Sequence, residues 1–161
     1  MKKEKSILVA NNKFAMTIHI TRYYGDSTIT KSYFSIEGTP FQCEAREPAY
    51  RDYTESFTGC SRYCLPTGQW KAHIKSSTYS PMTLILQPCP GHRSAKVIYS
   101  YLKQADTGNI VIGRANPQDE PEYRQIEQSH ETFLQLEKLL YEAYGREEEI
   151  IVKIENPKQP Y

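Results

Sequence analysis

Side chains that could bind an anion are concentrated between residues 92 and 114 of the chain. Arginine and lysine donate charge-assisted hydrogen bonds to phosphate or carboxylate groups. Tyrosine adds a flat face on which a base or a sugar can stack, together with a hydroxyl. The candidate ligand-binding residues in this stretch are His92, Arg93, Lys96, Tyr99, Tyr101, Asn109 and Arg114. They indicate a site for a small polar or anionic ligand.

Tyrosine is unusually frequent, with 13 residues in a chain of 161, more than twice the roughly 3% of ordinary proteins. Tyr99 and Tyr101 share one face of a predicted strand, because side chains alternate along a strand. If that face lines a cleft, the two rings can flank a ligand together. If it faces the core or the solvent, they are ordinary strand aromatics. The sequence leaves both interpretations open.

The cysteines offer a second kind of chemistry. A catalytic thiolate needs a neighbouring base, and Cys89 precedes His92 by three residues in a Pro-Gly turn. Cys60 and Cys64 could combine with this pair in a four-ligand zinc site, although their spacing is loose. Free cysteine is commonly buried. We therefore predict buried or idle thiols, with no catalytic residue, no bound metal and no cofactor.

Length and charge limit the class of protein. A chain of 161 residues suits one domain, predicted here over residues 13–155 with flexible tails over 1–12 and 156–161. Its 20 basic and 19 acidic residues give a net charge of +1, which does not favour long nucleic acid or an anionic membrane. No apolar run could span a bilayer, and the N-terminal one is too short for a signal peptide. The expected location is the cytoplasm.

Alternation of apolar and polar residues dominates the first two-thirds of the chain. Phe14, Met16, Ile18 and Ile20 share one face of a strand whose other face is mostly polar. Loops rich in Pro, Asp, Glu, Tyr and Gly are expected over 47–64 and 114–128. The predicted strands cover 14–22, 28–36, 40–46, 70–76, 82–87, 96–101, 109–113 and 150–154.

One helix is predicted, beginning at Ser129 as the N-cap and ending at Gly145 in a left-handed conformation. Its apolar stripe should face the core. The stripe consists of Phe133, Leu136, Leu139, Leu140, Ala143 and Tyr144. The predicted fold class is mainly β (α+β), a mixed, mostly antiparallel sheet or barrel-like domain with this C-terminal helix packed on it.

The stretch Cys89-Pro-Gly-His-Arg-Ser-Ala-Lys-Val-Ile98, followed by Asp106-Thr-Gly-Asn-Ile-Val-Ile-Gly113, carries a family resemblance. It resembles the active-site segment of a small phage- and prophage-associated domain family of unknown function, itself similar to L,D-transpeptidase catalytic domains. The resemblance covers roughly residues 15–154 and implies an L,D-transpeptidase-like fold. It also implies that Glu47 matches the family's carboxylate, which could hold an arginine at the wall of the cleft.

This chain departs from the family at the reactive positions, where Ile98 replaces a histidine and Asn109 replaces a cysteine. An isoleucine cannot accept a proton, and an asparagine amide cannot form a thioester. We therefore predict a non-catalytic binding protein of phage or prophage origin that holds a small anionic or polar ligand in a former active-site cleft. A nucleotide-derived immune signal withheld from the host is one such ligand, and the bacterial cytoplasm is then the expected location.

Two alternatives remain open at this point. The protein could be a cell-wall enzyme, or the remnant of one, that acts on peptidoglycan fragments with Cys89 or another thiol. It could instead be an interaction module of a virion or a lysis cassette, with its tyrosine-rich loops as the interface. The sequence does not fix whether the protein forms a homo-oligomer.

Overall fold

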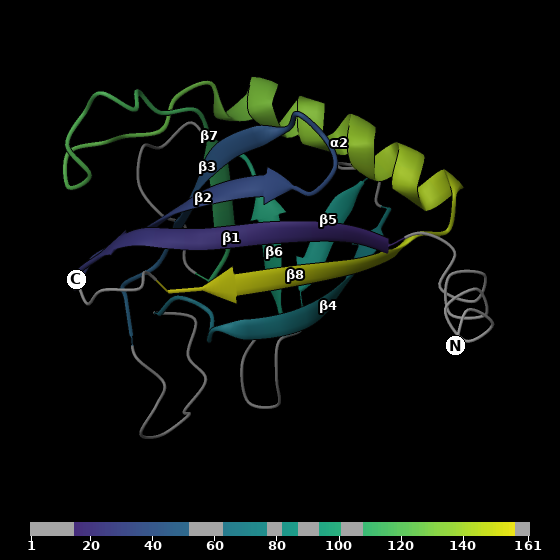
Figure 1. Ribbon diagram of the computed structural model, residues 1–161, viewed down its shortest axis with the longest axis horizontal. Helices are drawn as coiled ribbons and strands as arrows, with labels where there is room; N and C mark the ends of the chain where they lie inside the picture. The colour runs from purple at the N-terminus through teal and green to yellow at the C-terminus, as the bar shows by residue number, and fades with distance from the viewer. Residues whose placement is uncertain (1–14, 52–62, 77–81, 87–93, 101–107, 157–161) are drawn as a thin grey trace, which may run out of the picture.

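Eight strands close into a single barrel in the computed structural model (Figure 1), which describes residues 15–51, 63–76, 82–86, 94–100 and 108–156. Around the barrel the strand order is β1-β2-β3-β7-β6-β5-β4-β8, and β8 pairs again with β1. The strands are β1 (Ala15–Gly25), β2 (Thr30–Ile36), β3 (Gln42–Glu47), β4 (Gly68–Lys75), β5 (Thr83–Leu86), β6 (Ala95–Ile98), β7 (Ile110–Gly113) and β8 (Glu149–Glu155).

The predicted fold class is confirmed in its main terms: the chain forms a mainly β, mixed barrel with one C-terminal helix, α2 (Ser129–Gly145). Six neighbouring strand pairs are antiparallel, and β1–β8 and β6–β7 are parallel. The predicted tails lie outside the described residues apart from Asn156.

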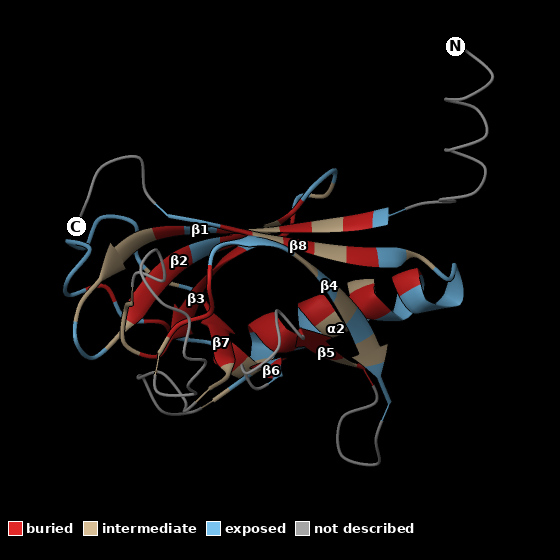
Figure 2. Cartoon of the chain, turned by 90° about the horizontal axis from the view of Figure 1, so that it is seen from below, coloured by how far each residue is buried: buried red, intermediate tan, exposed pale blue. Residues whose placement is uncertain are grey.

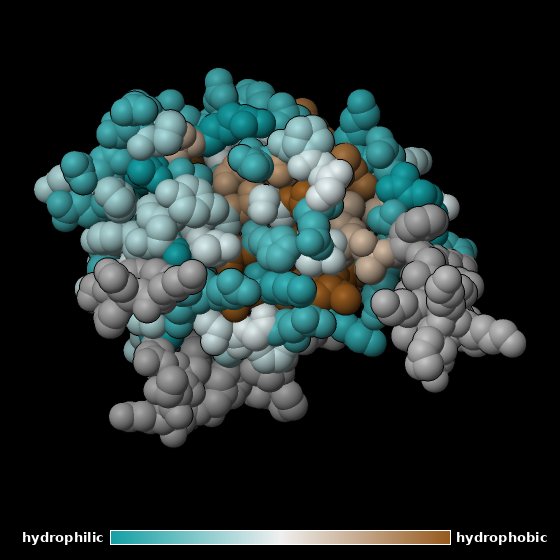
Figure 3. All heavy atoms as spheres, in the orientation of Figure 1, coloured by the Kyte–Doolittle hydropathy of each residue, from teal (hydrophilic) through white to brown (hydrophobic). Residues whose placement is uncertain are grey.

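Alternation along the strands fills the barrel interior. Met16, Ile18 and Ile20 of β1 are buried, and so are Ile150 and Val152 of β8, while the residues between them are more exposed. Figure 2 shows this as alternating colours along both strands. The outward-facing residues are largely polar, and hydrophilic atoms cover most of the face seen in Figure 3. Period-2 patterning therefore places one apolar core inside the barrel.

The helix contributes its apolar stripe to the same core through Phe133, Leu136, Leu140 and Ala143. Tyr144 was predicted to belong to this stripe, but it is 55% exposed, because Ala143 takes the inward position at the end of the helix. No transmembrane helix is found among the described residues.

Both predicted helix ends differ in detail from the structure. The N-cap is Gln128, with φ 51°, rather than Ser129. The Ser129 hydroxyl instead donates a hydrogen bond of 2.5 Å to the Ile112 carbonyl, which anchors the helix to β7. At the other end Gly145 is not left-handed; Glu147 is, with φ 54°.

The barrel has two unlike ends. Strand directions place the ends of β1 and β3 together with the starts of β2 and β7, and we call this the polar end because Arg22 and Glu47 are buried there. The opposite end, where β1 and β8 begin, is the helix end. There α2 runs from β7 to the start of β8 (Figure 1).

Candidate ligand-binding groove

The structure divides the predicted ligand-binding residues between the two ends of the barrel. Glu47, Lys96 and Asn109 lie at the polar end, and Tyr99 and Arg114 lie at the helix end. His92, Arg93 and Tyr101 lie outside the described residues, as do Cys60 and Cys89. The described members of the predicted set do not form one site.

The two positions of the missing reactive pair lie on neighbouring strands but are offset. Ile98 is opposite Val111 in the β6–β7 register, whereas Asn109 immediately precedes β7. The Asn109 side-chain oxygen accepts a hydrogen bond of 3.1 Å from the Lys96 backbone N–H. Neither Ile98 nor Asn109 lines either of the two hollows described below. The former-cleft hypothesis therefore gains no support from these two positions.

Glu47 holds an arginine inside the barrel. Its carboxylate lies 3.1 Å from Arg22 Nη2, and both side chains are 1% exposed. The Leu65 backbone N–H donates to the same carboxylate at 2.9 Å, and Arg22 Nη1 donates to Asn156 Oδ1 at 3.2 Å. A buried ion pair needs such additional hydrogen bonds to offset the desolvation of its charges. The arrangement fits a scaffold role at the polar end.

Tyr99 packs against the helix. Its ring centroid lies 4.5 Å from that of His130 and 5.3 Å from that of Phe133, and the residue is 39% exposed. Tyr99 directly follows β6, and its ring contacts are typical of an aromatic side chain that packs between secondary-structure elements.

A second charged network covers the outer face of β2 and β3. Glu44 lies at its centre, 3.1 Å from Arg46 Nη1 and 3.4 Å from Arg124 Nη1. The Tyr23 hydroxyl also donates a hydrogen bond to Glu44. Burial and this hydrogen bond raise the pKa of the Tyr23 phenol, so it stays a neutral donor. The network around Glu44 therefore contains one negative charge, on Glu44, and two positive charges, on Arg46 and Arg124.

Segment 114–128 covers this network. Lys31 Nζ donates to three of its carbonyls, those of Pro121, Glu122 and Arg124, at 2.8–3.0 Å. Arg46 Nη2 donates to the Arg124 carbonyl at 2.9 Å. A charged residue on an outer strand face usually points into solvent, but here Lys31 and Arg46 are 4% and 1% exposed.

Beside this network lies a hollow of about 640 Å³, which we call the Arg114 groove. Its volume falls within the roughly 300–1,000 Å³ of small-molecule sites. It lies between β2, β3 and the first residues after β7. The lining residues are Tyr33, Phe34, Ser35, Pro40, Gln42, Cys43, Glu44, Arg114, Ala115 and Pro117.

Arg114 and Tyr33 are the groove's most useful groups for binding. The Arg114 guanidinium is exposed and is oriented by the Gln42 carbonyl at 3.3 Å and by Gln135 Oε1 at 2.7 Å. The Tyr33 ring is 48% exposed and stacks on Tyr23 with centroids 4.6 Å apart. Its hydroxyl accepts a hydrogen bond of 3.3 Å from Arg124. The groove thus offers a held cation and a supported aromatic face.

The one cysteine in the groove is not a reactive thiol. Burial raises the pKa of Cys43 to about 12, so the thiol is protonated at neutral pH. Burial also raises the pKa of Cys64, the other described cysteine. No three His, Cys, Asp or Glu side chains come together as a metal site within the described ranges. The zinc alternative involves Cys60, Cys89 and His92, which lie outside them.

Sequence reasoning found Arg114 but missed Tyr33, Glu44, Arg46 and Arg124. A usable signal was present, because Lys31, Tyr33, Glu44 and Arg46 occupy the outward positions of two adjacent predicted strands. Basic and aromatic side chains paired across strands indicate an organised outer face. Segment 114–128 gave no comparable signal. Its position depends on hydrogen bonds from Lys31 and Arg46 to its backbone carbonyls, which a pattern of side chains does not predict.

Comparison with protein-family models, curated proteins and solved structures finds no match to this chain. The resemblance to the phage-associated, L,D-transpeptidase-like family therefore stays a prediction.

Proposed function

We propose that the protein is a non-catalytic binding protein that holds a small anionic ligand in the Arg114 groove. The observation that carries this proposal is the exposed guanidinium of Arg114 held beside an aromatic face and a network in which cations outnumber carboxylates. A guanidinium fixed by neighbouring acceptors binds phosphate or carboxylate with little loss of entropy.

The ligand class we favour joins a planar ring to an anionic group, as a nucleotide-derived signal does. The ring would stack on Tyr33, and the phosphate would meet Arg114. The flanking Pro40, Ala115 and Pro117 provide apolar walls. A role as a phage- or prophage-encoded sponge for such a signal accords with the sequence resemblance and with the protonated thiol of Cys43.

The first test measures binding of a nucleoside monophosphate by calorimetry and by thermal shift. Ligand binding to the native state alone should raise stability by about 2.7 kcal/mol at a ligand concentration 100 times Kd. Arg114→Ala should weaken binding roughly 10- to 100-fold, because a charge-assisted hydrogen bond is lost.

Lys96→Ala is the matched control, since it removes an exposed cation from the face that carries Asn109. We expect it to leave the affinity unchanged. If Lys96→Ala weakens binding and Arg114→Ala does not, the ligand occupies the β6–β7 face and our placement is wrong. Absence of binding by any phosphate-bearing ligand would contradict the binding function itself.

The contribution of the ring can be tested separately. Tyr33→Leu should reduce the affinity for a nucleoside monophosphate by about tenfold and leave ribose 5-phosphate binding nearly unchanged, because base stacking contributes about 1–3 kcal/mol. Tyr33→Phe keeps the ring and should behave like the natural protein. Equal losses for both ligands with Tyr33→Leu would exclude the stacking role.

A further inference from the structure

Two polar side chains in the Arg114 groove have hydrogen-bonding capacity that the described part of the chain does not use. Ser35 of β2 and Gln42 of β3 lie opposite each other in the strand register, and both line the groove. Neither the Ser35 hydroxyl nor the Gln42 amide forms a hydrogen bond with another described residue. Side chains at such a pair lie about 4.5–5.5 Å apart at Cβ, so one small ligand group can contact both.

Arg114 reaches the same part of the groove from the β7 side. Its Nη1 donates to the Gln42 backbone carbonyl at 3.3 Å, and its Nη2 donates to Gln135 Oε1 at 2.7 Å. A guanidinium has five N–H groups, so donors remain for a ligand after these two bonds. Arg114, Ser35 and Gln42 therefore bring hydrogen-bond donors to one place from three different segments of the chain.

The next pair along the same two strands is Tyr33 and Glu44. Two residues along a strand correspond to about 7 Å. The Glu44 carboxylate repels an anion at this pair, whereas the Tyr33 ring can stack on a planar group. The sugar of a nucleotide holds the base and the phosphate apart by a comparable length. A nucleotide would therefore place its base at the Tyr33 pair and its phosphate at the Ser35 pair.

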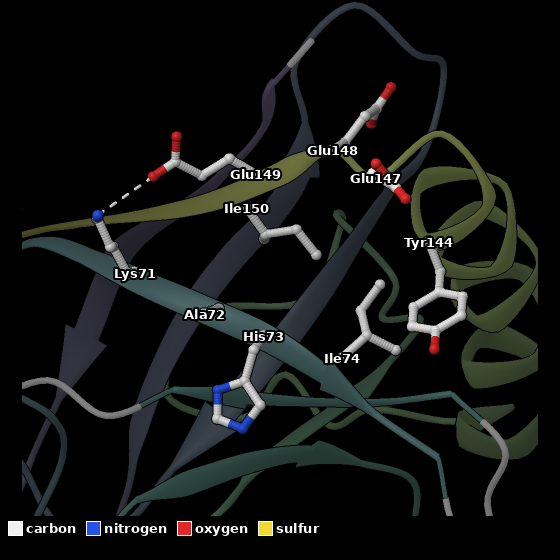
Figure 4. Close-up of a pocket in the computed structure, with 9 residues that line it drawn as sticks. All are labelled: Lys71, Ala72, His73, Ile74, Tyr144, Glu147, Glu148, Glu149 and Ile150. Atoms are coloured by element: carbon white, nitrogen blue, oxygen red, sulfur yellow. Dashed lines mark ion pairs between the residues drawn. The ribbon is translucent and has the colours of Figure 1, made fainter. Parts of the chain in front are cut away.

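A second hollow suits an anion less well. It has a volume of about 480 Å³ and lies between the end of α2 and β4, and we call it the α2–β4 hollow (Figure 4). Its lysine, Lys71, forms an ion pair with Glu149 at 3.4 Å, drawn as a dashed line in Figure 4. Glu147 and Glu148 also line it, and their carboxylates have the same sign of charge as a phosphate. An anion is therefore expected in the Arg114 groove.

We propose that Ser35 and Gln42 complete a phosphate subsite with Arg114, and that this subsite selects a terminal phosphate monoester over a phosphodiester or a carboxylate. The inference rests on the proposed function of the groove. A phosphate monoester presents three free oxygens, one for each of the three donor groups. A phosphodiester and a carboxylate each present only two, so one of the three groups is left without a ligand oxygen.

The first experiment compares three adenosine ligands by calorimetry on the full chain: adenosine 5′-monophosphate, cyclic AMP and adenosine 5′-carboxylic acid. We expect the monophosphate to bind at least tenfold more tightly than the other two, because it alone can contact all three donor groups. Equal affinities for the three ligands would overturn this inference and leave the proposed anion-binding function standing. No binding of any of the three would contradict the proposed function, and the inference with it.

Variants at the two new positions separate hydrogen bonding from ligand charge, since the monophosphate is also more negative than cyclic AMP. Ser35→Ala and Gln42→Leu should each weaken binding of the monophosphate about tenfold, because each removes a hydrogen bond to a charged group. Both should weaken binding of cyclic AMP less, so the preference for the monophosphate should fall. A preference that stays the same in both variants would assign it to ligand charge alone and overturn the subsite.

Two control variants locate the subsite. Gln69→Leu repeats the glutamine substitution at an exposed position of β4 that lines neither hollow. Lys71→Ala removes the lysine of the α2–β4 hollow. Both should bind the monophosphate like the natural chain, and melting curves check that every variant is folded. If Lys71→Ala weakens binding and Gln42→Leu does not, the phosphate lies in the α2–β4 hollow and the inference is wrong.

Discussion

The two buried charge networks of this barrel use similar residues but balance them differently. Inside the barrel one arginine, Arg22, meets one carboxylate, Glu47, and the Leu65 backbone and the Asn156 side chain add further hydrogen bonds. On the outer face one carboxylate, Glu44, faces both Arg46 and Arg124. Among the described residues the first network holds one charge of each sign, whereas the second holds more positive than negative charge beside a groove. Burial of charge alone therefore does not indicate function; the balance of charge next to an open space is more informative.

The largest effect is expected inside the barrel. Arg22→Met leaves the Glu47 carboxylate buried without its cation, which should lower the free energy of unfolding by about 3–5 kcal/mol. Urea denaturation measures this change.

The double variant Arg22→Met with Glu47→Leu is the control, because removing both charges avoids the unpaired carboxylate. Its stability should return most of the way towards that of the natural protein. If both variants lose the same stability, the ion pair is not the source of the effect.

A smaller effect on stability is expected on the outer face. Glu44→Gln leaves Arg46 and Arg124 without their shared carboxylate and should cost about 2–3 kcal/mol. Because negative charge is removed beside the Arg114 groove, the same variant should bind a nucleoside monophosphate several-fold more tightly. Calorimetry on Glu44→Gln therefore tests whether the charge of the outer network changes the affinity of the groove for the ligand. Unchanged or weaker binding would show that it does not raise this affinity.

A substitution at Gly113 should weaken the packing of segment 114–128 over the outer network. A Cβ atom on Gly113 would lie 2.9 Å from both the Glu127 carbonyl oxygen and Ile126 Cβ. Gly113→Ala should therefore push residues 126–127 away and cost about 1–3 kcal/mol. Hydrogen exchange should rise at the Arg114 and Glu127 amides, which pair with each other, and stay unchanged in the barrel interior. A uniform rise in hydrogen exchange across all strands would show that segment 114–128 and the barrel unfold together.

The smallest effect concerns Asp26 in the turn between β1 and β2. Although partial burial acts to raise it, hydrogen bonds from Thr28, Tyr24 and Ile29 hold the pKa of Asp26 at about 2. A carboxyl whose pKa is lower in the folded state stabilises the protein above its unfolded value of about 3.9 and loses that contribution as pH falls towards 2. Asp26→Asn should therefore lower Tm at pH 6, and its difference from the natural protein should shrink between pH 4 and pH 2. A difference in Tm that stays constant over this range would contradict a stabilising effect of the ionised Asp26 carboxylate.

The barrel could be predicted from the sequence because its signals are local. Alternation in residues 14–22 and 150–154 gave β1 and β8, and the stripe from Phe133 to Leu140 gave the buried face of α2. The parallel pairing of β1 with β8 could not be predicted, because strand periodicity identifies faces but not neighbours.

The site was harder to predict, because its members meet only after folding. Arg114 was identified from its charge, but its groove depends on Tyr33 and on a stacking contact with Tyr23 across β1 and β2. Glu47 was expected to hold an arginine at a cleft wall; it does hold one, Arg22, but inside the barrel. A charged residue near a strand end can face inward or outward, and only the register of its neighbours decides which.

The seven-residue parallel pairing of β1 with β8 has a consequence for biosynthesis. Nearly all of the described chain separates these two strands, so the ring of hydrogen bonds stays incomplete until the ribosome has released β8. Contacts between such distant segments form slowly, and apolar surfaces stay open meanwhile. We expect a nascent chain that stalls before residue 149 to require chaperones and to be degraded readily, whereas the finished chain resists proteolysis.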